Sequence, residues 1–514
     1  MPARYSIDDD LAEAERTLPA VWRRRARLGR TEPFLWFKGS PARTVEQFDA
    51  EILAAAQTLC GHGIKKGDRV CVLMKNSPEM LATMLGLWQA GAVVVPLSAQ
   101  MVGPLLLDQV SRARVALAIA DDALAPQLAP LAVPVVEKDR FMRESASADA
   151  ADAPQSGVSF DDPALILYTS GSTGPSKGCM LSQHFCVYYG WIFWRYMGYR
   201  RDDVIYSCLP LNHVHALFAS FFPALLAGAQ YSFSERFSAS RYWPEIADSG
   251  ATTCSAIGPM ASILLKQPAS EAEARLRVRL AHIAPAPPGV EEFQKRFRLR
   301  VASTLFGMTE AMIFPPDPQR DPVPGVIGVA PADWDVALVD DFGREVAADE
   351  PGELVARPRR PHILFDGYFD MPEETVKAWR GLWYHTGDVC RRDADGVYWF
   401  MGRKRDQIRR RGENVSAWEL ESLLGAHPAV SEIAALGVSS PLGEEEIVLF
   451  VRHAEGSPVS VDALKAFSEK VVPKFMRPDR ILIRKDELPK TPSGKIDKRQ
   501  LQAMLLEGKG QAGE

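Results

Sequence analysis

The sequence lacks the cysteine and histidine spacings that indicate a disulfide framework or a zinc site. Its 514 residues include seven cysteines, none in a C-x-x-C pair, and nine histidines, none spaced as H-x-x-x-H. Disulfides staple small extracellular domains, and closely spaced Cys or His residues hold structural zinc. Neither class of protein fits this chain.

A secretion signal and a membrane span are missing as well. The stretch MPARYSIDDDLAEAERTL is acidic and has no apolar core of the kind that a signal peptide needs. The most apolar stretch, Met80 to Leu97, is interrupted by Gln89, Gly91 and Pro96, which predicts a buried helix, a glycine stop and a strand. We therefore expect a cytoplasmic protein.

Neither sign of charge is in large excess. The 60 basic and 65 acidic residues give a net charge of -5 and are mixed along the chain, which argues against a face that binds nucleic acid. The densest basic run is GRKRDQIRRRG, Gly402 to Gly412. It is either a solvated charged loop or a contact for a phosphorylated ligand.

Apolar runs alternate with helical patterns through roughly the first 330 residues. Runs such as DRVCVLM, GAVVVPL, DVIYSCLPL and ATTCSAIG are predicted strands, and TVEQFDAEILAAAQTLCGHG is a predicted helix. This alternation predicts two α/β units with largely parallel sheets. From about Val326 to Phe400, recurring turn signals indicate a β-rich subdomain, and the remaining chain returns to mixed helix and strand.

The segment TSGSTGPSKG, Thr169 to Gly178, follows a predicted buried strand, ALILYTS. Glycines allow backbone N–H groups to turn toward an anion, hydroxyls add donors and a lysine adds charge, as in loops that bind phosphate. The segment is not the common P-loop, because Gly174 precedes a proline and Lys177 precedes a glycine. Taken alone, it is either a polyphosphate loop or a flexible surface turn.

Three further stretches each present a polar residue beside an apolar run or a turn. LFGMTEAM puts Thr309 and Glu310 at the end of a predicted strand, RVASTLF, where α/β sheets bind ligands. YHTGD places Asp388 behind a glycine turn, where its carboxylate could meet ribose hydroxyls, and PKTPSGKIDK presents Lys495 beyond a turn. Each alone is weak, because a carboxylate on a turn is usually a turn former or a cap.

Taken in order, six segments resemble the acyl-adenylate-forming superfamily of AMP-dependent synthetases and ligases, which includes acyl-CoA synthetases, luciferases and the adenylation domains of peptide synthetases. They are YTSGSTGPSKG, LPLNHVHAL, FGMTE, YHTGD, GRKRDQIRRRGENVSAWELE and PKTPSGKIDK, and the resemblance covers nearly the whole chain. It implies an α/β fold in which a large N-terminal region of two α/β subdomains plus a β-subdomain is hinged to a small α+β C-terminal domain. We expect an AMP-binding domain at 1–402, a hinge at 403–406, within Gly402 to Asp406, and a C-terminal domain at 407–514.

The resemblance implies that a carboxylate attacks the α-phosphorus of ATP and that the thiol of CoA then displaces AMP. The residues that would hold the departing phosphates are Thr169, Ser170, Gly171, Ser172, Thr173, Gly174 and Lys177. Thr309 would face the α-phosphate, and Glu310 would hold magnesium as a hard oxygen ligand. The cofactors and co-substrates implied are therefore ATP, magnesium and coenzyme A.

The resemblance also assigns the nucleoside and the moving domain. Phe306 would stack on adenine where many members have tyrosine, and Asp388 would bind the ribose with help from Arg403. Lys495 would bridge the acyl carboxylate and the phosphate when the small domain closes over the site. The segment IAPAPPGVEEF departs from the Gly-Gly-Ala-Pro-like segment of the family, so adenine contacts at 284–289 are not assigned.

For the second step, the resemblance makes Arg405 the hinge residue and assigns the CoA path to Gly412 and Glu413, with some of Arg409, Arg410 and Arg411 meeting CoA phosphates. His213 matches a gate between the adenylate and thiol tunnels, the alternative being a core histidine. The acyl pocket would be lined by His213, Val214, His215, Phe218, Ser255, Ile257, Gly258 and Met260.

The acid remains open between a polar or small one, which the histidines favour, and an aromatic one, which Phe218 and Met260 favour. RRRGENVSAWELE, together with TSGSTGPSKG, resembles the carnitine/crotonobetaine-type and related small-acid CoA ligases more than the long-chain fatty acid group. The predicted function is an ATP-dependent acyl-CoA ligase acting on a small carboxylic acid, with no nucleic-acid partner and with a homodimer left open. The alternatives are an adenylation enzyme that loads a carrier-protein thiol, a luciferase-like oxygenase, and a nucleotide-binding protein without catalysis.

Overall fold

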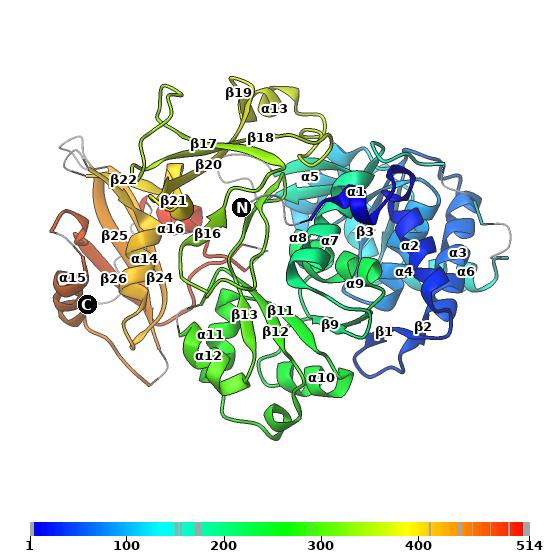
Figure 1. Cartoon of the computed structure of the whole chain (residues 1–514), viewed down its shortest axis with the longest axis horizontal. Coiled ribbons are helices and arrows are strands. Elements are labelled where there is room, and N and C mark those ends of the chain that lie inside the picture. Colours follow the sequence, from blue (N-terminus) through cyan, green and yellow to red (C-terminus); the bar gives the residue numbers. More distant parts are fainter. Residues whose placement is uncertain are drawn as a thin grey trace. The chain divides into compact units, whose positions relative to one another are not determined.

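The computed structural model describes residues 5–149, 153–154, 157–169, 176–287, 289–410, 413–439, 445–454, 456–472, 474–491 and 494–506 (Figure 1). The chain divides into two compact units, Met1–Asp335 with Pro358–Ala378, and Val336–Arg357 with Trp379–Glu514. The β-rich stretch predicted for the N-terminal region is shared between these units. The predicted hinge at 403–406 lies within the second unit and stays a prediction.

The first unit contains two large sheets. The strands of one are β1 (Pro33–Phe37), β2 (Arg43–Thr44), β9 (Val204–Ser207), β10 (Gln230–Phe233), β11 (Thr253–Ile257), β12 (Leu280–Ala284) and β13 (Arg300–Ala302). Their order is β13-β12-β11-β9-β10-β1-β2, and only the edge pair β1–β2 is antiparallel. The continuous apolar runs of these strands suit parallel sheets buried on both faces.

The other sheet repeats this plan. Its strands are β3 (Arg69–Leu73), β4 (Val93–Pro96), β5 (Leu117–Ala120), β6 (Val135–Glu137), β7 (Pro163–Thr169) and β8 (Lys177–Ser182). They lie in the order β6-β5-β3-β4-β7-β8, and only β7–β8 is antiparallel. The prediction of two α/β units with largely parallel sheets is confirmed.

Helices connect these strands. They are α1 (Ile7–Asp10), α2 (Leu18–Leu28), α3 (Val45–Gly61), α4 (Pro78–Gln89), α5 (Gly103–Ala113), α6 (Lys138–Ala146), α7 (Gln183–Met197), α8 (Val214–Ala216), α9 (Phe222–Ala227), α10 (Tyr242–Ser249), α11 (Gly258–Lys266), α12 (Val290–Phe297) and α13 (Pro372–Ala378). Several begin at a hydroxyl cap: the side chain of Ser77 accepts a hydrogen bond from the backbone of Met80 at the start of α4. Helix α4 ends before Gly91, whose φ of 79° turns the chain into β4, so the predicted helix, glycine stop and strand are confirmed.

One predicted strand is wrong in its bounds. The run RVASTLF does not form a single strand, because β13 ends at Ala302 and a separate short strand, β14 (Phe306–Gly307), follows. Strand β14 pairs with β15 (Met312–Phe314), and a fourth short element, β16 (Val326–Val329), follows along the chain. Thr309 and Glu310 therefore lie in the turn between β14 and β15, not at the end of a sheet strand.

The second unit combines strands and helices around its own core. Its elements are β17 (Trp334–Val339), β18 (Gly352–Pro358), β19 (Trp379–Arg380), β20 (Trp383–Arg392), β21 (Val397–Arg403), β22 (Gln407–Arg410), β23 (Glu413–Ser416), α14 (Ala417–Gly425), β24 (Val430–Ser439), β25 (Glu445–His453), α15 (Val461–Val471), β26 (Arg480–Arg484) and α16 (Lys498–Leu506). Strands β21-β20-β18-β17 form one sheet, β22-β23 a hairpin and β24-β25-β26 another sheet. The predicted β-rich stretch and the mixed C-terminal part are confirmed.

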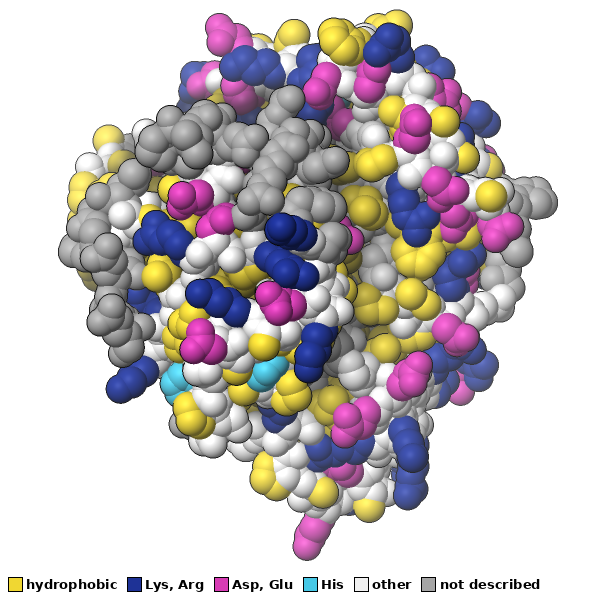
Figure 2. Space-filling view, turned by 90° about the vertical axis from the view of Figure 1, so that its left-hand side faces the viewer, with side chains coloured by type: hydrophobic (Ala, Val, Ile, Leu, Met, Phe, Trp, Pro, Cys, Tyr) yellow, Lys and Arg dark blue, Asp and Glu magenta, His cyan; other side chains and the backbone are white. Residues whose placement is uncertain are grey.

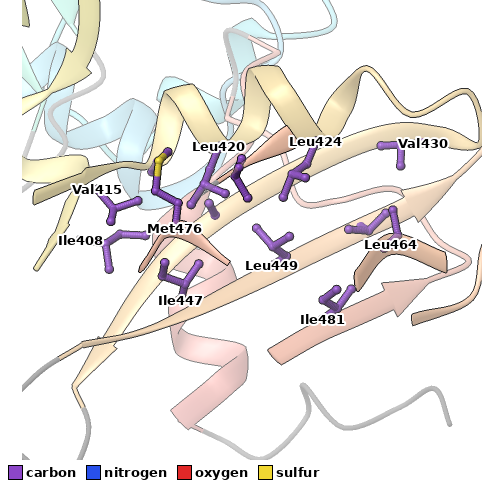
Figure 3. Packing of buried hydrophobic residues seen from close by; sticks show 14 of the residues in the cluster. Ile408, Val415, Leu420, Leu424, Val430, Ile447, Leu449, Leu464, Met476 and Ile481 are labelled. Carbon is purple, nitrogen blue, oxygen red and sulfur yellow. The ribbon is translucent and has the colours of Figure 1, made fainter. Parts of the chain in front are cut away.

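The core of the C-terminal part is the apolar cluster in Figure 3. Leu420 and Leu424 of α14 pack on Ile447 and Leu449 of β25, and Leu464 joins them from α15. All five side chains are nearly inaccessible to water. At roughly 25 cal/mol per Å² of apolar surface removed from water, such burial supplies the main driving force for folding this part of the chain.

On the face drawn in Figure 2, basic and acidic side chains are interspersed among the described residues. None of the helices in the described ranges combines the length and the apolar character needed to cross a membrane.

Candidate active site

The β7–β8 hairpin carries the two ends of the predicted phosphate loop. Thr169 is the last residue of β7, Lys177 is the first of β8, and the two are direct partners in the antiparallel register. The hydroxyl of Thr169 donates to the carbonyl of Lys177 over 3.4 Å. Residues 170–175, which include Ser170, Gly171, Ser172, Thr173 and Gly174, lie outside the described residues.

Lys177 has two partners in the first unit. Its ammonium lies 2.6 Å from Glu374 of α13 and 4.8 Å from the centre of the Tyr368 ring, a cation–π arrangement. Hydrogen bonds from Lys177 and Lys377 lower the pKa of the Glu374 carboxyl to about 2. Glu374 is therefore an anion at neutral pH. It pairs with the Lys177 ammonium, the group that the sequence analysis predicts to bind phosphate.

Glu310 lies close to the same strand. Its side chain is buried, and Oε1 accepts a hydrogen bond of 2.7 Å from the Tyr368 hydroxyl. The Cys179 thiol of β8 lies near Glu310, and burial first and the charge of Glu310 second raise the pKa of that thiol well above its usual range. Thr309, beside Glu310, is half-buried.

The surroundings of Glu310 suit a hard cation bound together with phosphate. Among the described residues, no Lys, Arg or His forms an ion pair with this carboxylate, and its hydrogen-bond donor is the neutral Tyr368 hydroxyl. The described ranges also contain no group of three His, Cys, Asp or Glu side chains able to hold a metal by themselves. Magnesium usually binds one or two carboxylates and completes its shell with water and substrate phosphates, so a single glutamate fits it.

The predicted adenine and acyl residues occupy several elements. Phe306 of β14 is mostly buried and contacts Phe314 edge-to-face across the hairpin. His213 is exposed and caps α8, where its Nδ1 accepts a hydrogen bond of 3.4 Å from the backbone of His215. It is not a core histidine. Val214, beside it in α8, is half-buried.

Other predicted pocket residues belong to the packed interior. Phe218 lies in a π-helical turn, Leu217–Phe221, and contacts Phe185 and Phe222. The Ser255 hydroxyl is hydrogen-bonded to those of Ser207 and Ser220, each at 3.0 Å. A serine whose hydroxyl is already bonded on two sides has little capacity left for an acyl group.

Gly258 makes room for the proline-rich segment. A Cβ at Gly258 would lie 2.9 Å from the carbonyl oxygen of Pro285, closer than side chains tolerate. Ile257 ends β11 just before it, and Met260 is buried in the first turn of α11. The absence of a side chain at 258 therefore lets the ends of β11 and β12 approach closely.

His215, which is half-buried, and His282, which is buried, form a histidine pair beside these residues. The rings of His215 and His282 are 4.8 Å apart, and burial lowers the pKa of His282 to about 4. Burial, followed by the nearby His282 and His213, lowers the pKa of His215 well below its usual range. Both rings are neutral at physiological pH.

In the second unit, Asp388 and Arg403 are neighbours on β20 and β21. They are register partners, and Arg403 Nε lies 2.8 Å from Asp388 Oδ1. Asp388 is 1% exposed and lies within a strand rather than on an open turn, although Gly387 before it has a φ of 71°. The predicted ribose residue is thus paired with its predicted helper.

Glu353 fixes the segment before Asp388. This buried carboxylate receives a hydrogen bond from Gly387 N over 3.3 Å and lies 3.2 Å from His385 Nδ1 and 3.0 Å from Lys404 Nζ. Burial alone would raise its pKa, but hydrogen bonds from His385 and Lys404 outweigh burial and lower the pKa to about 2.

Lys495 is exposed on a tight turn. Thr491 N donates to the Lys495 carbonyl over 2.7 Å, and Lys495 N donates to Thr491 Oγ1 over 3.3 Å. The residues predicted to border the CoA path are described only in part. Glu413 begins β23 opposite Arg410, whereas Arg411 and Gly412 lie outside the described residues. Arg405 and Arg409 have a described backbone only.

Sequence reasoning missed Tyr368, Glu374, Glu353 and His282. Tyr368 and Glu353 belong to the stretches FDGYF and DEPGE, two of the turn signals between Val326 and Phe400. Tyr368 is 58 residues from Glu310, so no local pattern links them. A buried carboxylate such as that of Glu310 needs hydrogen-bond donors, and that requirement alone indicates that a partner such as Tyr368 exists.

Comparisons with known proteins agree over nearly the whole chain. The family model described as AMP-binding enzyme matches residues 22–369, and the model described as AMP-binding enzyme C-terminal domain matches 419–495. A curated relative, crotonobetaine/carnitine–CoA ligase of Salmonella heidelberg (strain SL476), is 30% identical over 476 residues, covering 88% of this chain and 91% of the relative.

Two solved structures illustrate the likeness of fold. ATP-bound MatB from Rhodopseudomonas palustris superposes with a TM-score of 0.84 and 25% identity, over 95% of this chain and 99% of that one. The anthranilate CoA ligase AuaEII, in complex with anthranoyl-AMP, gives a TM-score of 0.88 at 21% identity, over 97% and 99% of the two chains.

Proposed function

The chain belongs to the AMP-binding enzyme family and is an acid–thiol ligase, and on this premise we propose that it joins a small carboxylic acid to CoA through an acyl-adenylate. In the first step a carboxylate oxygen attacks the α-phosphorus of ATP and the bond to pyrophosphate breaks. In the second, the CoA thiol attacks the acyl carbonyl and AMP leaves.

The observation that carries this proposal is the cluster at the start of β8. Lys177, Glu310 and Thr169 are the family's phosphate and metal residues by motif, and Lys177 and Glu310 both contact Tyr368. A lysine and a carboxylate that share one aromatic neighbour suit a polyphosphate with its counter-ion. Catalysis of phosphoryl and adenylyl transfer depends mainly on such positioned charges.

Glu310 is the proposed magnesium ligand. Bound magnesium would neutralise charge on the phosphates as pyrophosphate leaves. The protein's own contribution is to hold the carboxylate buried and oriented by the Tyr368 hydroxyl. Thr309 is proposed to donate its hydroxyl to the α-phosphate.

The remaining roles follow the family motifs. Asp388, assisted by Arg403, is proposed to bind the ribose hydroxyls, and Phe306 to stack on adenine. Lys495 is proposed to neutralise the acyl carboxylate and the α-phosphate during adenylation. The second step is proposed to use rotation about 403–406, with Gly412 and Glu413 along the CoA path and His213 as the gate.

For the acid, we propose a small carboxylic acid, the class that includes the substrates named for the curated relatives. The hydroxyl of Ser255 is engaged by Ser207 and Ser220, and His215 and His282 are neutral, so the inner side of the predicted pocket offers no fixed charge from these residues. A second carboxylate or a cationic group on the acid would need another partner.

The test is to incubate the purified protein with ATP, magnesium, CoA and a panel of acids: short-chain, betaine-like, sulfonated, benzoate-like and medium-chain. AMP, pyrophosphate and acyl-CoA are followed together by mass spectrometry. Equal amounts of AMP and acyl-CoA from one acid support the proposal and name the substrate. Adenylate without thioester across the panel would replace CoA with a carrier-protein acceptor, and no AMP with any acid would contradict adenylation.

A further inference from the structure

The segment Phe365–Phe369 joins the phosphate strand to Glu310. Phe369 N donates to the Gly178 carbonyl over 2.8 Å, and Met180 N donates to the Gly367 carbonyl over 3.0 Å, so the segment runs antiparallel to β8. At its other end, Phe365 N donates to the backbone carbonyl of Glu310 over 2.9 Å. One short segment therefore contacts both β8, which begins at Lys177, and the backbone of Glu310. The proposed function assigns Lys177 to the polyphosphate and Glu310 to its metal ion.

Tyr368 is the central side chain of this segment. Its hydroxyl donates to Glu310 Oε1 over 2.7 Å, and its ring lies under the Lys177 ammonium at 4.8 Å from the ring centre. The side chain is 7% exposed, and its backbone N–H donates to Thr375 Oγ1 over 2.9 Å. The ring cannot change rotamer without breaking several contacts.

From these contacts we propose that Tyr368 is a positioning residue that fixes Glu310 for the metal and Lys177 for the polyphosphate as one unit. The inference rests on the proposed function. The hydroxyl holds one carboxylate oxygen, which leaves the other oriented toward a cation, and the ring face confines the ammonium beside it.

Two substitutions separate the roles of the ring and the hydroxyl. Tyr368→Phe keeps the ring under Lys177 but removes the donor to Glu310. Tyr368→Leu removes both. A hydrogen bond to a charged group is worth about 1.5–3 kcal/mol, which corresponds to roughly 10- to 100-fold in an equilibrium constant.

The first measurement is binding, made by calorimetry without any acid or turnover. ATP affinity is measured with and without magnesium in the wild type, in both variants and in Tyr199→Phe. Tyr199 is a matched control, because it is a buried tyrosine whose hydroxyl donates to the Ala219 carbonyl at 3.3 Å. We expect Tyr368→Phe to lose about tenfold of the magnesium-dependent gain in ATP affinity while its magnesium-free affinity stays within about twofold.

Tyr368→Leu should in addition weaken magnesium-free ATP binding, because the loss of the ring leaves the Lys177 ammonium to Glu374 alone. In turnover, Tyr368→Phe should lower kcat and raise the magnesium concentration needed for half-maximal rate, with little change in KM for the acid. The control variant should match the wild type in every measurement. Thermal unfolding is recorded for each protein.

If Tyr368→Phe does not fold, Thr375→Val provides the same test from outside the ring, because it removes the acceptor that fixes the Tyr368 backbone. We expect a smaller shift in the same direction. Magnesium-dependent ATP binding equal to that of the wild type, in a folded Tyr368→Phe or Thr375→Val variant, would overturn the inference and leave the proposed function standing. A wild type that makes no AMP from any acid would instead remove the proposed function.

Discussion

At the scale of single residues, Lys495 separates the two proposed half-reactions. It is exposed on a turn in the second unit, as expected for a group that acts only when presented to a substrate. Lys495→Ala should lower adenylate formation about 10²- to 10³-fold, the usual cost of losing one charge-stabilising donor. Thioester formation from a supplied acyl-adenylate should stay within about twofold of the wild type.

Separate assays of pyrophosphate release and of thioester formation check this expectation. Lys485→Ala is the control, since Lys485 is an exposed lysine of the same unit that no motif includes. An equal loss in both half-reactions would show that Lys495 does not belong to the first step alone.

Replacing the buried carboxylate of Glu353 should destabilise the protein. Glu353→Gln leaves His385 and Lys404 without their shared carboxylate and should destabilise the protein by about 1.5–3 kcal/mol, the usual worth of a hydrogen bond to a charged group. Urea unfolding at pH 7 measures the change. Glu345→Gln, an exposed carboxylate 3.8 Å from Arg392, should change stability by less than about 0.5 kcal/mol.

The pH dependence of this effect has a definite sign. The pKa of Glu353 is lowered to about 2 from an ordinary value of 4.5, so its stabilisation is complete above the unfolded value and is lost as the pH falls through about 2. The difference between wild type and Glu353→Gln should therefore be constant above about pH 5 and shrink at lower pH. A difference that grows on acidification would contradict this assignment.

At the scale of elements, helix α13 would compete with the proposed nucleotide phosphates for Lys177 of strand β8. Glu374 of α13 holds the ammonium of Lys177 at 2.6 Å, and a polyphosphate that takes Lys177 has to replace it. Glu374→Gln should lower the KM for ATP about two- to fivefold, because partly exposed ion pairs are worth roughly 0.2–1 kcal/mol. Steady-state kinetics at saturating acid and CoA measure it, with Glu373→Gln, the neighbouring glutamate of α13, as control. An unchanged or higher KM would mean that Lys177 does not meet the phosphates.

Elements were predictable wherever the pattern was local. The apolar runs of β3, β4, β7, β9 and β11 end at glycine, proline or polar residues, and the structure confirms each as a strand. The prediction of one strand over 300–306 is wrong. These alternating small and polar residues form β13 and then begin β14, which makes a separate hairpin with β15. Asp388 lies inside β20 for the same kind of reason: pairing with β21 outweighs the turn preference of His-Thr-Gly.

At the scale of the whole molecule, acid stability depends on buried histidines in the first unit. Burial lowers the pKa of His184 and of His282 to about 4, from 6.5. Between these values the unfolded chain binds protons that the folded chain does not, so the contribution of these two histidines to stability falls as the pH decreases from about 6.5 to about 4 and then levels off. Each histidine accounts for up to about 3 kcal/mol over that window.

Urea unfolding across pH 4 to 8 checks this. In His282→Asn, the free energy of unfolding should fall less steeply with decreasing pH, by the slope that corresponds to about one proton. His427→Asn is the control, because that half-buried histidine is in the second unit. An unchanged slope in His282→Asn would mean that His282 is not the group that titrates.

The candidate site, like the fold, has a part that the sequence predicts and a part that only the structure shows. The motifs that name Thr169, Lys177, Glu310, Asp388 and Lys495 are contiguous in sequence, so their residue types and order could be recognised without coordinates. The partners of these residues could not. Glu374 reaches Lys177 from a distant helix, and Glu353 reaches Gly387 across 34 residues.

By itself, the amino-acid sequence determined the family, the α/β class, the parallel sheets and the residue types of the proposed nucleotide site, because strands, helices and phosphate loops are encoded by short-range patterns of apolar residues, glycines and hydroxyls. Only the tertiary structure decided which side chains hold those residues in place. Tyr368 became the link between Glu310 and Lys177 because a buried carboxylate and a confined ammonium must find partners in space, and folding brings those partners from segments with no common pattern.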